Sequence, residues 1–291
     1  MHSQRRVSRL APLIAVVTLL VVPGTVAAAD GATFCVPFTG QNGAGQIAVS
    51  AGWERGTRAT IEGQPITSCI DTGPGYRSGT FEWVSVDDGA LSGSNIVQVG
   101  YGRCLRTNNS ADYGWTNCNG QLYWYWAWGS DCGPGDPTGS GGMNGAIPLR
   151  IGAALSSPPP TKDIYVLREN VGGTYYYDAY VGGVLLQGTD ALGNNRVARV
   201  AASAICWDSD TPTRGLTWFG ETFNESDSMG GWNAAGVANH LDYTLLRYSI
   251  NTGWLVPLLG PPNSHCSESD PTIYTCKVVD NQHIYLDTIS R

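Results

Sequence analysis

The apolar residues of this chain occur in short alternating runs, and no segment keeps its apolar residues at helical spacing. The runs are rich in β-branched and aromatic side chains and end at Gly, Asn, Asp or Pro, a pattern typical of strands. The 38 glycines and the 14% share of charged residues suit short strands joined by tight turns. Ten such runs predict an all-β chain folded as a β-sandwich or jelly roll. The runs are GQIAVSAGWE, TFEWVSVD, SNIVQVGYGRC, LYWYWAW, DIYVLRE, GTYYYDAYVGGVLLQG, RVARVAASAICW, LTWFGETF, LDYTLLRYSI and IYLDTI.

Residues 1–29 have the features of a secretory signal peptide. Three arginines precede an apolar run at 10–22, which is shorter than the ~20 residues that span a bilayer, and small residues follow at 27–29. We therefore expect a secreted, extracellular protein whose mature chain is 30–291. We find no second apolar run, so we expect no membrane anchor.

The mature chain, 30–291, is expected to form a single β-sandwich domain. Its first residues are expected to add N-terminal strands, and the tail after Trp254 is expected to be irregular because of its prolines. The segment LSSPPPTKD is either an interdomain linker or a stiff crossover between strands. Gly182 and Gly183 predict the two-residue turn of a hairpin, since glycine adopts positive φ without strain.

All eight cysteines lie in the mature chain, and none forms a CxxC pair. An even number in an exported chain predicts a disulfide framework rather than a metal site. Short intervening loops favour two bridges, and the other four cysteines form two further pairs in one of several possible connectivities. The favoured bridges are Cys104–Cys118 and Cys266–Cys276. For the other four cysteines we expect the pairs Cys35–Cys69 and Cys132–Cys206.

Charge and missing motifs exclude several kinds of partner. The mature chain has 14 basic against 24 acidic side chains, a net charge of about −10. Binding to nucleic acid or to an anionic membrane depends on Lys and Arg, so neither partner is expected. His240, His265 and His283 are scattered and form no metal-binding motif. We expect no metal and no cofactor, a monomer, and a polypeptide or glycan as substrate or ligand.

Two polar side chains are candidates for chemistry. Gln98 alternates with Val97 and Val99 in its run, so it lies on the opposite strand face and is either a functional amide or a solvated one. Glu221 shares a strand face with Thr217, Phe219 and Phe223. Partial desolvation would raise the pKa of its carboxyl and suit it to acid–base catalysis. The alternative is a glutamate that only accepts hydrogen bonds from the following loop.

Aromatic side chains are the candidate substrate-binding residues. The run from Tyr123 to Trp128 alternates two faces, of which one or both can belong to the core. A face that is exposed on a concave sheet would stack on sugar rings or receive apolar side chains of a peptide. The candidates are Trp83, Tyr125, Trp126 and Trp218.

Taken in order, several short motifs resemble the glutamic peptidases, in both the eqolisin and the neprosin-like branches. WVSVD, Trp83 to Asp87, is similar to a Trp-Val-x-x-Asp strand, and VQVGY places Gln98 at the family's Gln or Glu position. The Trp/Tyr-rich strand is matched by YWYWAW. WFGE, which ends at Glu221, resembles the neprosin-like Trp-Gly-Gly-Glu, and SMGG resembles the Met-Gly-x-Gly that follows. The resemblance covers 83–231.

The resemblance implies a concanavalin-like sandwich of two antiparallel sheets and an acid-acting glutamic endopeptidase. It would make Glu221 the general base that activates water, while the Gln98 amide orients that water and stabilises the oxyanion. The chain departs from the eqolisin branch at Thr217, where that branch has an acidic residue. Two other functions therefore stay open: a sandwich that binds glycan or peptide on an aromatic concave face without cleaving it, and a structural surface protein.

Overall fold

The computed structural model describes residues 34–35, 42–50, 54–61, 66–73, 78–87, 95–106, 118–129, 149–190, 193–207, 214–223, 228–229, 231–232, 238–239, 241–249, 253–256, 264–268, 274–278, 280 and 282–288. The predicted signal peptide and Cys132 lie outside these residues, and so does the side chain of Cys266.

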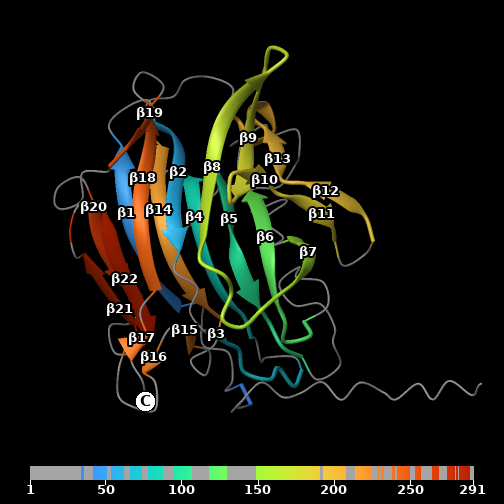
Figure 1. The fold of residues 1–291 in the computed structure, drawn as a ribbon, viewed down its shortest axis with the longest axis vertical. Helices are drawn as coiled ribbons and strands as arrows, with labels where there is room; N and C mark the ends of the chain where they lie inside the picture. Colours follow the sequence, from blue (N-terminus) through green and yellow to red (C-terminus); the bar gives the residue numbers. More distant parts are fainter. Residues whose placement is uncertain are drawn as a thin grey trace, which may run out of the picture.

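The described part of the chain is a sandwich of two antiparallel sheets, which confirms the predicted fold class (Figure 1). One sheet has seven strands and contains all of the candidate site residues. In spatial order its strands are β20 (Ser264–Glu268), β1 (Asn42–Ser50), β14 (Arg214–Thr222), β4 (Thr80–Asp87), β5 (Ile96–Arg103), β6 (Leu122–Gly129) and β7 (Leu149–Leu155).

The second sheet has nine strands and includes the long β8–β9 hairpin, which rises above the sandwich in Figure 1. Its main path is β10 (Val184–Leu185), β9 (Thr174–Val181), β8 (Lys162–Val171), β2 (Glu54–Ile61), β18 (Leu241–Ser249), β22 (His283–Thr288) and β21 (Tyr274–Val278). β13 (Arg199–Ala201) pairs with β9, and β19 (Gly253–Leu255) pairs with β18. The short pairs are β11 (Gln187–Thr189) with β12 (Asn195–Val197), β15 (Ser228–Met229) with β3 (Ile66–Thr67), and β16 (Gly231–Trp232) with β17 (Ala238–Asn239).

The main apolar core lies between the two sheets and follows from the alternation of the strands. Val84 on β4 and Val99 on β5 are fully buried, and so are Ile164 and Val166 on β8 of the second sheet. The Trp218 side chain also points into this core, where its indole N–H donates to the carbonyl of Arg58 at 3.1 Å. This hydrogen bond joins β14 of one sheet to β2 of the other.

Most of the predicted strand runs form strands, and the hairpin turn is confirmed. Gly182 and Gly183 have φ angles of 59° and 81°, and Val184 pairs with Val181 across the turn. The proline-rich segment at 156–161 connects β7 of the first sheet to β8 of the second.

Two expectations about regular structure are wrong. The run at 196–207 is not one strand, because it breaks into part of β12, β13 and a short 3-10 helix, Ala202–Ile205. The tail after Trp254 is not irregular, because β20 pairs with β1 while β21 and β22 extend the second sheet. The strands of the tail therefore contribute to both layers of the sandwich.

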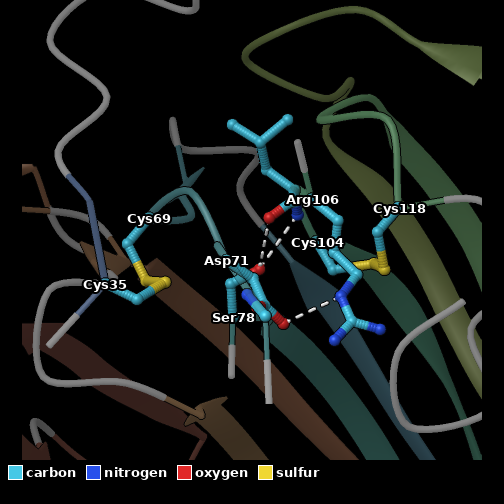
Figure 2. Close-up of polar contacts among 9 residues, drawn as sticks. Cys35, Cys69, Asp71, Ser78, Cys104, Arg106 and Cys118 are labelled. Carbon is cyan, nitrogen blue, oxygen red and sulfur yellow. Dashed lines mark hydrogen bonds and ion pairs between the residues drawn. A yellow bond between two sulfur atoms is a disulfide. The ribbon is translucent and has the colours of Figure 1, made fainter. Parts of the chain in front are cut away.

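Two of the predicted disulfides, Cys35–Cys69 and Cys104–Cys118, are present. Figure 2 shows them on either side of Asp71, whose carboxylate pairs with Arg106 at 3.0 Å. Cys206 and Cys276 are also disulfide-bonded, although the described side chains do not include their partners, so those pairings stay predictions. Such bonds are typical of oxidising compartments.

The described residues contain one short 3-10 helix, Ala202–Ile205. Among these residues, no helix has the length and apolar character needed to cross a membrane.

Candidate functional site on the outer face of the seven-stranded sheet

The candidate residues lie on the face of the seven-stranded sheet that points away from the second sheet, here called the outer face. On β4, the side chains at odd positions from Phe81 to Asp87 alternate with Val84 and Val86, which pack into the core between the sheets. Phe81 and Trp83 belong to a separate apolar cluster on the other side of the strand. The period-2 pattern of β4 thus places its two aromatic rings together with Ser85 and Asp87 on the outer face.

Three cross-strand rows on this face follow from the strand register. Side chains that pair directly in an antiparallel sheet lie on the same face, so each row is a line of neighbours across four strands. The Gln98 row consists of Ala127, Gln98, Ser85 and Thr217, the Trp83 row of Tyr125, Gly100, Trp83 and Phe219, and the Glu221 row of Tyr123, Gly102, Phe81 and Glu221.

Gln98 and Glu221 therefore share a sheet and a face, with one complete row between them. Gln98 pairs with Ser85 and Glu221 pairs with Phe81, so the two rows are separated by about 13 Å along β4. The two side chains also lie on strands about 10 Å apart, since β4 is between them. One bridging water joins polar atoms only about 5–6 Å apart. The register therefore does not form the one-water Gln98–Glu221 dyad that the family mechanism implies.

The surroundings of the Glu221 carboxyl favour proton transfer. Its side chain is buried, with the residue only 7% exposed, and its Oε2 accepts a hydrogen bond from the indole N–H of Trp83 at 3.0 Å. Burial raises the pKa of the Glu221 carboxyl to about 7, although the Trp83 hydrogen bond lowers it in part. The carboxyl thus changes its protonation state near neutral pH.

Aromatic rings produce that burial. Phe81 pairs directly with Glu221 in register and packs edge-to-face on Phe223, with ring centroids 5.5 Å apart. Trp83, which donates to the carboxyl, packs against Phe219 at 5.2 Å. The carboxyl is therefore held among apolar rings by one directional hydrogen bond.

Asp87 is the carboxylate closest in register to Gln98, and sequence analysis gave it no chemical role. Its Oδ2 accepts hydrogen bonds from the hydroxyls of Ser85 at 2.8 Å and Thr217 at 2.7 Å. Because Asp87 pairs with Ile96, it is the diagonal neighbour of Gln98 on the same face. The signal was present in WVSVD, where Asp87 lies four positions after Trp83 and therefore on its face, but the order of the strands was needed to reveal its neighbours.

The predicted substrate-binding residues separate into two groups. Trp126 and Trp218 are in the core between the sheets and are 5% and 0% exposed, so the prediction that they bind substrate is wrong. Their register partners, Val99 and Val84, point the same way. Tyr125 is on the outer face but is completely buried, which also removes it from substrate contact in this structure.

Of those four aromatic candidates, Trp83 donates a hydrogen bond to a candidate catalytic residue, Glu221. Its row also contains Gly100, whose missing side chain is required because a Cβ there would collide with the carbonyl of Glu82. Gln98, by contrast, is partly exposed. Solvent therefore reaches the outer face at the Gln98 amide more readily than at the Glu221 carboxyl.

Within the described residues, no group of three or more His, Cys, Asp or Glu side chains is arranged to hold a metal ion. The polar groups that the three rows and Asp87 bring to the outer face include one amide, several hydroxyls and two carboxyls.

No family model and no curated protein matches this sequence. Among solved structures, the chain is similar to a crystal structure of Scytalido-glutamic peptidase with a peptide based transition state analog. The TM-score is 0.39 and the sequence identity is 10%, over 86% of this chain and 98% of that chain.

Proposed function

We propose that the protein is an exported hydrolase of the glutamic-peptidase type, which cleaves polypeptides on the outer face of its seven-stranded sheet. The observation that carries this proposal is Glu221, a buried carboxyl with a pKa raised to about 7 on the same face as Gln98. The order of the motifs from Trp83 to Gly231 supports the same type of enzyme.

In this proposal Glu221 is the general base. When it is ionised, it takes a proton from the water that attacks the scissile carbonyl, and it then returns that proton to the leaving amine. Trp83 holds the carboxyl through Oε2, so in this proposal Oε1 is the oxygen that takes the proton from the water. Because only the ionised form is a base, activity is expected to rise as pH increases toward and through 7. This expectation differs from the acidic optimum that the family resemblance implies.

Gln98 has a separate task in this proposal, because its row is one row removed from Trp83 and two from Glu221. The two positions are about 16 Å apart on the diagonal of the sheet, and an extended peptide rises about 3.3 Å per residue, so a segment of about five residues that crosses the Trp83 row can reach both. The Gln98 amide would bind the peptide backbone and fix its register over Glu221. Its loss is expected to weaken substrate binding more than it slows the chemical step.

The test is hydrolysis of denatured protein and of peptides of about five or more residues by the purified mature protein, over a pH series from acid to mildly alkaline. Glu221→Gln is expected to reduce kcat by at least about 100-fold. Gln98→Ala is expected to raise KM mainly. Glu169→Gln, on the second sheet, serves as the matched carboxyl control and should retain activity.

The outcome for Asp87→Asn decides between the two carboxyls of the outer face. Activity that survives Glu221→Gln but is abolished by Asp87→Asn would assign the base to Asp87 and overturn the role of Glu221. Absence of hydrolysis in the folded wild-type protein at every pH would overturn the hydrolase itself.

A further inference from the structure

A second buried glutamate, Glu82, lies on the opposite side of β4 from the outer face, and the proposed reaction does not use it. Its side chain points into the core between the sheets and is 0% exposed. The hydroxyl of Tyr101 donates to Oε2 at 2.7 Å. Oε1 has no hydrogen-bond partner among the described residues. A single neutral donor is far less than an ionised carboxylate requires in an apolar interior.

Two arginines on strands packed against β4 make contacts elsewhere. On β5, Arg103 donates to the carbonyl of Ile66 at 3.0 Å. On β8, the Arg168 guanidinium lies over the ring of Tyr175 at 4.1 Å. On β2, Arg55 lies on the same strand face as the core residue Ala59, but it is at the start of that strand.

The remaining strand packed against β4 adds no described charge to this face. On β14, the direct partner of Glu82 is Gly220, and Trp218 and Leu216 are the buried neighbours. No ion pair of Glu82 is formed within the described part of the chain. The surroundings therefore fit a neutral carboxylic acid better than a carboxylate, because burial penalises the charged form most.

We propose that protonation of Glu82 controls whether the two sheets of the sandwich stay packed. When Glu82 carries its proton the sheets pack together, and loss of the proton drives them apart. The folded protein is thus built to persist in acid and to open as the pH rises. The only ligand that controls this transition is the proton. This inference does not depend on the proposed hydrolase, because it concerns the core and not the outer face.

The direction of the effect follows from linkage. Burial raises the pKa of Glu82 well above its ordinary value, although the Tyr101 hydrogen bond opposes this shift. Stability from this group is complete below the unfolded pKa of about 4.3 and is lost as pH rises through the folded pKa. Between those two values the unfolding equilibrium constant increases about tenfold per pH unit for this one proton.

The experiment is urea unfolding of the full mature protein from pH 4 to 10, for wild type, Glu82→Gln and Glu221→Gln. Glu221 is included because the pKa of its carboxyl is also raised, to about 7, so it contributes a loss of stability between about pH 4.3 and that value. In wild type the midpoint urea concentration is expected to fall as pH rises. Glu221→Gln is expected to keep the part of this fall that is due to Glu82. Glu82→Gln keeps the shape of the side chain but cannot titrate, so it is expected to remove that part. Glu169→Gln, from the second sheet, is expected to leave the fall unchanged.

Infrared difference spectroscopy gives a second measurement that does not need Glu82→Gln to fold. In folded Glu221→Gln at pH 7, a C=O band from a protonated carboxyl is expected, since ordinary carboxyls are ionised there. Absence of this band would overturn the proposal. So would a folded Glu82→Gln variant whose stability declines with pH as steeply as that of wild type.

Discussion

Glu221 and Glu82 illustrate how neighbouring positions of one sheet acquire different chemistry. Glu82 pairs with Gly220, the residue just before Glu221, yet the two glutamates are on opposite faces. Glu221 has an indole donor at the edge of an aromatic cluster, whereas Glu82 has a phenol donor within the main core. The pKa of both carboxyls is raised by burial, but only Glu221 lies on the face that carries Gln98 and Asp87.

At the residue scale, Trp83→Phe tests how Trp83 controls Glu221. The indole N–H stabilises the ionised carboxylate, so its removal is expected to raise the pKa of Glu221 above about 7. The lost hydrogen bond and packing are expected to cost about 2 kcal/mol of stability at pH 8, where the carboxylate form prevails. The measurements are an NMR titration of the Glu221 side chain and urea unfolding.

Trp124→Phe is the matched control, because Trp124 packs edge-to-face on Tyr101 on the core side of the same sheet. It should leave the titration of Glu221 in place. A Trp83→Phe protein in which Glu221 titrates at the wild-type pH or lower would contradict the assigned hydrogen bond.

Among the secondary-structure elements, the strands with strong alternation were the ones that the sequence identified best. TFEWVSVD was expected as a strand and is β4, Thr80–Asp87. β7 was missed because LRIGAAL is rich in Gly and Ala, which have low strand propensity. The run at 196–207 was overextended for the same reason, since its ASAI segment forms the 3-10 helix Ala202–Ile205, which Cys206 caps with a φ of 56°.

The close approach of β4 and β5 gives a prediction for Gly100. Gly100→Ala would push a methyl group into the carbonyl of Glu82, a backbone atom that cannot rotate away. The strands must separate, so we expect a loss of about 1–3 kcal/mol in the free energy of unfolding, measured by urea denaturation. Val184→Ala, at a residue that is 64% exposed, is the control and should change stability little. A Gly100→Ala protein as stable as wild type would show that this approach is not tight.

For the whole molecule, the disulfides restrict the unfolded chain over loops of different length. The sequence separation is 34 for Cys35–Cys69 and 14 for Cys104–Cys118. Loop-closure entropy then predicts a loss of about 4 kcal/mol when the first pair is replaced by serines, and about 3 kcal/mol for the second. Urea unfolding of the two double variants under oxidising conditions measures both. The reverse order of destabilisation would contradict this entropic account.

The sequence by itself determined the all-β class and the strand face of each candidate, because alternation with period 2 is a local property of the backbone. It thus put Gln98 on the face opposite Val97 and Val99, and its loop lengths favoured the Cys104–Cys118 bridge. The tertiary structure decided which strands are neighbours and in which register they pair. β14 joins β4 across more than 100 residues of chain, so no local pattern encodes that Thr217, and not Glu221, lies in the row of Gln98. Burial was decided in the same way, since only the packing of the second sheet on the first removed Trp126, Trp218 and Glu82 from solvent.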